Sequence, residues 1–111
     1  MKKFVWLSFD LGVKGDYEGL YAWLDSQNAR ECGESLAGLN VEISDERRLP
    51  TLLKKALSTS VDLDKRSRIY VVFFDSRTRK VRGQFIFGSR RRPPWTGYGG
   101  SPAEAEEDLA G

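Results

Sequence analysis

Asp10 is the residue of this sequence best placed to do chemistry. It ends the apolar run FVWLSFD, residues 4–10, and the loop LGVKGD follows it. A carboxylate at the end of a buried strand can hold Mg²⁺ or Mn²⁺ and orient water for attack on a phosphodiester. It can equally accept hydrogen bonds from loop amides and so tie down the turn. One carboxylate is a weak metal site, so the metal hypothesis needs a second Asp10 from a symmetric partner.

The residue types that are missing exclude several classes of enzyme. The chain has no histidine and a single cysteine, Cys32. Ser-His-Asp and Cys-His catalytic arrangements and the usual zinc sites are therefore excluded. No internal disulfide can form, and the sequence predicts a cytosolic protein. Asp16 and Asp75 are further carboxylate candidates, and each is better explained as a helix cap or a turn residue.

Basic residues gather in the second half of the chain and predict a polyanionic partner, RNA or DNA. The stretch from Lys65 to Arg92 has ten basic residues, with Asp75 as its one acid. The tail, 101–111, has four acids and no base, so the net charge of +2 becomes +6 over residues 1–100. Such an excess on a small domain favours phosphate contacts, although it also suits a merely solvated surface. The candidate nucleic-acid-binding residues are Arg77, Arg79, Lys80, Arg82, Arg90, Arg91 and Arg92.

Trp95 follows the last arginines and has two interpretations. With Tyr98, it could stack on unpaired bases. Alternatively, the stiff lead of Pro93 and Pro94 could carry it across a partner subunit as a clip. The sequence slightly favours the second interpretation for Trp95, and slightly favours a polyanion contact for the arginines before it.

The apolar pattern predicts the elements that must position these residues. A strand over 3–11 alternates between two faces, both of them apolar near its start, which predicts a central strand covered on both sides. A helix is expected over 17–28, a weaker strand over 29–43 and a second helix from Leu49-Pro50. Two strands over 68–75 and 81–88 form a hairpin, because SRTRK between them is a turn sequence.

This β-α-β-α-β-β order predicts an α+β sandwich of the ferredoxin-like kind. Two helices can cover one face of a four-stranded antiparallel sheet. The other face is apolar and needs a partner, so we expect a homodimer through that face or through a sheet edge. The expected organisation is a domain over 1–88, an Arg/Pro/aromatic extension over 89–100 and an acidic disordered tail over 101–111. No apolar run is long enough to cross a membrane.

Three segments resemble a known family. VWLSFDL ending on Asp10, ECGESLAGL and DLDKRSRIYVVF are similar to the small non-integrase subunit of CRISPR adaptation complexes and to its virulence-associated protein D relatives. The resemblance covers about residues 3–87. It implies a ferredoxin-like homodimer in which Asp10 faces its twin and holds a divalent metal, Mg or Mn. Members of this family are metal-dependent nucleases, ribonucleases or purely structural subunits.

Two functions therefore stay open. The first is a dimeric nucleic-acid-processing protein, an endoribonuclease or endonuclease with paired Asp10 residues as its catalytic metal site. The second is a non-catalytic regulator or assembly subunit that binds a nucleic acid or an acidic protein through the basic residues and the extension. A small-ligand domain is the weakest alternative, because the uncovered face lacks convergent polar groups in the sequence pattern.

Overall fold

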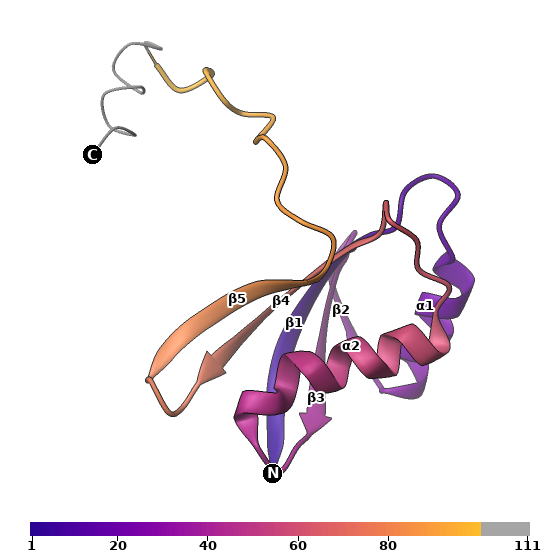
Figure 1. Cartoon of the computed structure of the whole chain (residues 1–111), viewed down its shortest axis with the longest axis vertical. Coiled ribbons are helices and arrows are strands. Elements are labelled where there is room, and N and C mark those ends of the chain that lie inside the picture. Colours follow the sequence, from indigo (N-terminus) through magenta and orange to yellow (C-terminus); the bar gives the residue numbers. More distant parts are fainter. Residues whose placement is uncertain (101–111) are drawn as a thin grey trace.

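The computed structural model describes residues 1–100 and has an α+β architecture (Figure 1). The described elements, in chain order, are β1 (Lys2–Asp10), α1 (Tyr17–Ser26), β2 (Arg30–Gly33), β3 (Leu36–Glu42), a 3-10 turn (Glu46–Arg48), α2 (Leu49–Ser60), β4 (Arg68–Asp75) and β5 (Lys80–Phe87). Within this part of the chain, neither helix combines the length and the apolar character that crossing a bilayer requires.

The strands form one antiparallel sheet in the order β2-β3-β1-β4-β5. Strand β1 lies in the middle, where Val5 pairs with Leu39 of β3 and with Phe73 of β4. Without β5, the connectivity is β-α-β-β-α-β, which is compatible with the predicted ferredoxin-like fold. Strand β5 extends the sheet beyond β4.

The segment 29–43 is a hairpin, so the prediction of one strand there is wrong. Glu34 and Ser35 lie between β2 and β3, and Arg30 pairs with Gly38 across the hairpin. The glycines suggested a bulge within one strand. A register shift between Glu31 and Gly33 is present, but the chain also reverses direction. The sheet therefore has five strands rather than four, in the order β-α-β-β-α-β-β.

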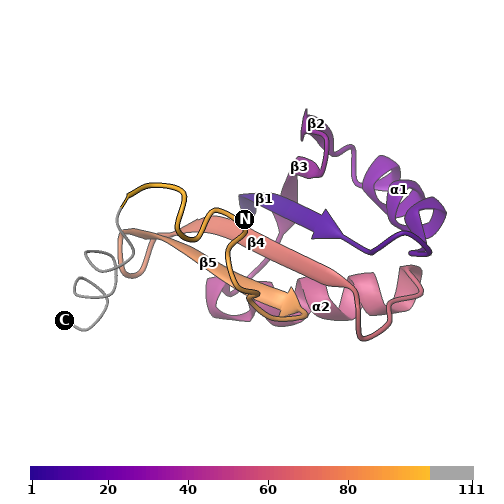
Figure 2. The same ribbon diagram turned by 90° about the horizontal axis from the view of Figure 1, so that it is seen from above.

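The core lies between the sheet and the two helices, which cover the same face (Figure 1, Figure 2). Asp16 caps α1 as predicted, because its Oδ1 accepts a hydrogen bond from the Gly19 N–H at 2.9 Å. Pro50 lies in the first turn of α2, where its missing N–H costs nothing. The buried side chains that meet in this layer include Val5, Leu7, Phe9, Leu20, Trp23, Leu24, Leu49, Leu53, Leu57, Ile69, Val71 and Phe73.

Neither helix of the described residues, 1–100, covers the opposite face of the sheet (Figure 2). On β1, Phe4 and Trp6 are 37% and 42% exposed, whereas their neighbours Val5 and Leu7 are fully buried. Phe74 is also exposed on this side. The alternation of β1 is thus as predicted, but only one of its faces is covered by this chain. Covering of the open face by a second copy stays a prediction.

The extension leaves the end of β5 and runs away from the helices (Figure 1). Residues 93–98 form turns, in which the Thr96 N–H donates to the Pro93 carbonyl and the Tyr98 N–H to the Trp95 carbonyl. Trp95 and Tyr98 are exposed. The predicted acidic tail, 101–111, lies outside the described residues.

Candidate nucleic-acid interface

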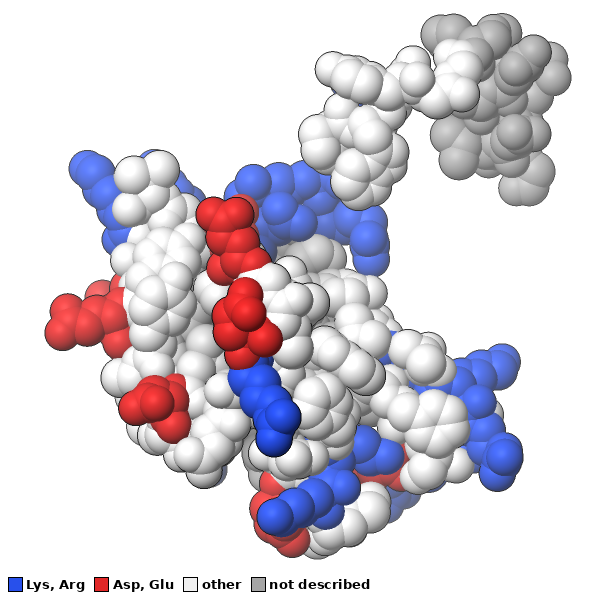
Figure 3. Space-filling model, turned by 180° about the vertical axis from the view of Figure 1, so that it is seen from behind, with Lys and Arg blue, Asp and Glu red and all other residues white. Residues whose placement is uncertain are grey.

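The predicted basic residues form two groups at opposite ends of β5. Strand β5 begins at Lys80 and ends at Phe87, so the first group surrounds the β4–β5 turn and the second follows the far end of the strand. Figure 3 shows Lys and Arg in separate patches rather than in one stripe. The turn group is Arg77, Arg79, Lys80 and Arg82, and the extension group is Arg90, Arg91 and Arg92.

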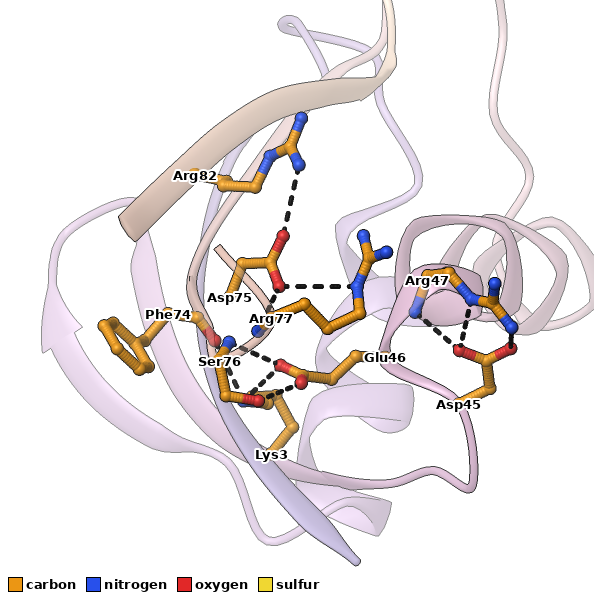
Figure 4. Close-up of polar contacts among 9 residues, drawn as sticks. All are labelled: Lys3, Asp45, Glu46, Arg47, Phe74, Asp75, Ser76, Arg77 and Arg82. Atoms are coloured by element: carbon orange, nitrogen blue, oxygen red, sulfur yellow. Dashed lines mark hydrogen bonds and ion pairs between the residues drawn. The ribbon is translucent and has the colours of Figure 1, made fainter. Parts of the chain in front are cut away.

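Half of the turn group has a structural role, because it neutralises the buried Asp75 (Figure 4). Arg82 Nη1 lies 3.1 Å from Asp75 Oδ2, and Arg77 Nε lies 3.6 Å from Oδ1. Burial alone would raise the pKa of Asp75, but the Arg82 hydrogen bond, the Arg77 N–H and the Arg77 charge together lower it. Arg79 and Lys80 have no ion-pair partner among residues 1–100. Asp75 therefore has a structural role in the turn, as predicted.

A second buried network holds the same turn, and no sequence pattern indicated it. Lys3 Nζ lies 2.6 Å from Glu46 Oε2 and donates to the Phe74 carbonyl at 2.9 Å (Figure 4). The Ser76 N–H donates to Glu46 at 3.0 Å, and its hydroxyl also bonds this carboxylate. Lys3 first, and then the two Ser76 donors, lower the pKa of Glu46 from 4.5 to about 2. The network joins β1, the 3-10 turn and the end of β4.

Aromatic rings lie across the open face of the sheet in two pairs. Phe4 and Trp6 meet edge to face with ring centroids 4.9 Å apart, and Tyr70 and Phe85 do so at 4.8 Å. The second pair joins neighbouring strands, because Tyr70 of β4 pairs with Phe85 of β5 in the register. Edge-to-face pairs hold rings in fixed orientations. The open face therefore presents two preformed aromatic platforms.

Glycines make room for these rings. A Cβ on Gly38 of β3 would lie 2.6 Å from the Phe4 ring, and a Cβ on Gly83 of β5 would collide with the Tyr70 ring and hydroxyl. Each ring thus lies against the backbone of the neighbouring strand instead of standing away from the sheet. Gly38 and Gly83 therefore have a packing function in the sheet.

Two arginines lie over the Tyr70–Phe85 platform. The Arg68 guanidinium is 5.3 Å from the Phe85 centroid. Arg90 is 5.8 Å from the Tyr70 centroid and 5.6 Å from that of Phe85. Arg90 is thus the predicted basic residue that the structure brings to the open face. Cation–π contacts hold both guanidinium groups against the rings and leave their edges free to bond other groups.

Asp10 lines a pocket of about 300 Å³ at this end of the sheet. Its Oδ1 accepts a hydrogen bond from the Gly12 N–H at 3.0 Å, as the turn interpretation predicted. Arg68 pairs with Asp10 in the β1–β4 register, but no ion pair among residues 1–100 involves either residue. The other lining residues are Ser8, Phe9, Arg68, Tyr70, Phe85 and Arg90.

Asp10 in one chain is poorly suited to hold Mg²⁺ or Mn²⁺. Hard divalent ions need several oxygen ligands, and the described residues contain no cluster of three or more His, Cys, Asp or Glu side chains with metal-site geometry. Arg68 and Arg90 line the same pocket and would repel a cation. The paired-Asp10 site depends on a second copy and stays a prediction.

The other predicted site residues lie apart from this pocket. Arg91, Arg92 and Trp95 are exposed, and Trp95 has no ring partner among residues 1–100. Asp16 accepts hydrogen bonds from the backbone N–H groups of Asp62 and Gly19, which lower its pKa. It is a cap, as predicted.

A larger hollow of about 810 Å³ lies beside α2 and the end of β3. Trp23, Ile43 and Leu52 supply its apolar lining. No predicted site residue and neither aromatic platform lies there, so its size does not make it the functional site.

Sequence reasoning did not single out Arg68, Tyr70 and Phe85 as site residues, because it expected a second copy of the chain to cover the sheet face that the helices leave open. A signal was present in the alternation along the strands. Ser8, Asp10 and Gly83 share the open face with the aromatics, and residues of these types are unusual on a doubly covered strand.

Comparisons with protein-family models, with curated proteins and with solved structures find no match for this chain.

Proposed function

We propose that this protein binds single-stranded nucleic acid on the open face of its sheet. The observation that carries the proposal is the position of Arg90 over both Tyr70 and Phe85, on the sheet face that neither α1 nor α2 covers. An aromatic ring stacks on a base, and a guanidinium beside it neutralises the phosphate that follows. A duplex hides its base faces, so exposed rings favour single strands.

The two platforms suggest a path for the strand. Phe4 and Trp6 lie on β1, next to β3, whereas Tyr70 and Phe85 lie on β4 and β5. A strand that crosses the sheet would meet both pairs and end beside Arg90, Arg91 and Arg92. Separate stacking positions with charges at one end support binding of several successive nucleotides without catalysis.

Fluorescence anisotropy with labelled single strands and with a matched duplex tests the proposal. Phe85→Ala should weaken binding of the single strand by about 1–3 kcal/mol, roughly 5- to 150-fold in Kd, because one stacked base is lost. Tyr21→Ala is the matched control, since Tyr21 is an exposed aromatic residue on α1, in the helix layer. Equal affinity of both variants for the single strand, or a preference for the duplex, would contradict the proposal.

A second copy of the chain is the competing occupant of this face. The predicted homodimer would bury Phe4 and Trp6 and so close the face to bases. The sedimentation coefficient of the free protein distinguishes between a nucleic acid and a second copy as the occupant of this face. A monomer at the concentrations where nucleic acid binds supports the proposal. A dimer that Trp6→Glu splits into monomers assigns the face to the second copy instead.

A further inference from the structure

Resting on the proposed function, we infer that the pocket of Ser8, Asp10, Arg68, Tyr70, Phe85 and Arg90 reads a guanine base within the bound strand. The rest of the open face offers rings and positive charge, which bind any base and any phosphate. This pocket adds a carboxylate, which phosphates repel. A carboxylate on a phosphate-binding face weakens general binding and favours a ligand that presents hydrogen-bond donors to it.

The charges of the pocket are kept apart. Asp10 and Arg68 are register partners in adjacent strands, yet the described structure forms no ion pair between them. Asp10 bonds the Gly12 N–H through Oδ1, whereas the Arg68 guanidinium lies over the Phe85 ring. Arg68 Nε is buried and has no hydrogen-bond partner within residues 1–100. A carboxylate and a guanidinium therefore both line the pocket with bonding capacity to spare.

The pocket suits one base by size. Its volume of about 300 Å³ is at the lower end of the range for small-ligand sites, roughly 300–1,000 Å³. The Tyr70–Phe85 pair supplies an aromatic wall. A planar base would stack on this wall in place of the Arg90 guanidinium, which would then lie at the edge of the base. The hydroxyl groups of Ser8 and Tyr70 can bond a sugar or a phosphate beside that ring.

Guanine is the base whose edges match both charged groups. Its N1–H and N2 amino group are adjacent donors, and together they fit the two oxygens of one carboxylate. Its O6 and N7 are adjacent acceptors, which fit the fork of a guanidinium. Adenine, cytosine and uracil lack one or both of these paired edges. Asp10 would thus read the donor edge, and Arg68 or Arg90 the acceptor edge.

Anisotropy with a uracil-only RNA strand, and with strands that carry one central guanine, inosine, adenine or cytosine, tests this inference. The guanine strand should bind about 5- to 150-fold more tightly than the adenine and cytosine strands. Inosine lacks the N2 amino group and should fall between them. Asp10→Asn keeps an oxygen that can accept from the Gly12 N–H. It should remove the guanine preference, because its amide offers one acceptor where the N1–H and the N2 amino group need two. Asp25→Asn on the exposed surface of α1 is the control and should keep the preference.

The outcomes separate this inference from the function on which it rests. Equal binding of all strands by the wild-type protein would overturn guanine recognition and leave single-strand binding intact. A guanine preference that survives in Asp10→Asn would overturn the role of Asp10. Failure of the wild-type protein to bind any strand would overturn both proposals.

Discussion

Lys3 and Glu46 form a buried ion pair, with Nζ 2.6 Å from Oε2, at the point where β1 passes the end of β4. Their side chains are only 13% and 5% exposed. Ser76 donates two further hydrogen bonds to the same carboxylate. Three donors on one buried carboxylate fix the β4–β5 turn against the central strand, at the end of the sheet opposite the Asp10 pocket.

This pair predicts a specific loss of stability in acid. The folded pKa of Glu46, about 2, lies below its ordinary value of 4.5. A depressed folded pKa stabilises the folded state above the unfolded pKa, and this stabilisation is lost as the pH falls through the folded pKa. Urea unfolding should therefore show that the free energy of unfolding falls more steeply between pH 6 and pH 2 in the wild-type protein than in Glu46→Gln. Glu46→Gln should also be less stable at pH 7.

Glu42→Gln is the control for this measurement. Glu42 is the last residue of β3, four positions before Glu46 in the sequence. Unlike Glu46, it is exposed, and its Oε1 lies 3.3 Å from the N-terminal nitrogen. Its variant should follow the wild-type pH profile. Matching profiles of wild type and Glu46→Gln would show that the Lys3 pair does not stabilise the fold.

The hydrophobic core predicts unequal effects of two neighbouring leucines on α2. Leu53 is fully buried between α2 and the sheet, whereas Leu52 is 40% exposed. Leu53→Ala should destabilise the protein by about 2–5 kcal/mol, because it removes apolar contacts and leaves a cavity. Leu52→Ala should cost much less. Denaturant unfolding, analysed with the same m-value for both variants, measures the two changes in the free energy of unfolding. Equal changes would contradict the packing of this helix.

The sequence predicted most of the fold because its local signals agree with the packing. The RIYVVFFD strand, the Asp16 cap and the Leu49-Pro50 helix start all lie where the pattern indicated. The β2–β3 hairpin was missed, since its reversal at Glu34 and Ser35 has no strong turn residue other than the neighbouring Gly33. Short hairpins with weak turn sequences are decided by pairing with a third strand, here β1.

The candidate site was only partly predictable, for a different reason. Asp10 and Arg90 stand out in the sequence by charge, but 80 positions separate them along the chain. Their common pocket depends on the β1–β4 register and on the bend of the chain after β5. Tyr70 and Phe85 were not predicted as site residues, because an apolar sheet face indicates burial against a partner subunit as readily as a ligand surface.

The extension arginines predict the salt dependence of binding. Replacing Arg90, Arg91 and Arg92 with Ala should weaken single-strand binding and flatten the plot of log Kd against log salt, by about 0.7 for each lost phosphate contact. Arg79 and Lys80 lie at the other end of β5, so their double Ala variant should change the slope less. An unchanged slope in the triple variant would remove the extension from the interface.

The paired-Asp10 metal site predicts metal-dependent dimerisation and cleavage, neither of which is expected of a single chain. If Mg²⁺ or Mn²⁺ bridges two copies, metal should raise the sedimentation coefficient of the wild-type protein, and Asp10→Ala should abolish both this change and any cleavage of RNA or DNA. Because Arg68 and Arg90 line the pocket of a single chain, we expect neither the change nor cleavage. Cleavage that needs metal and Asp10 would establish a nuclease and contradict non-catalytic binding. Asp25→Ala is the matched control, since Asp25 is an exposed carboxylate on α1.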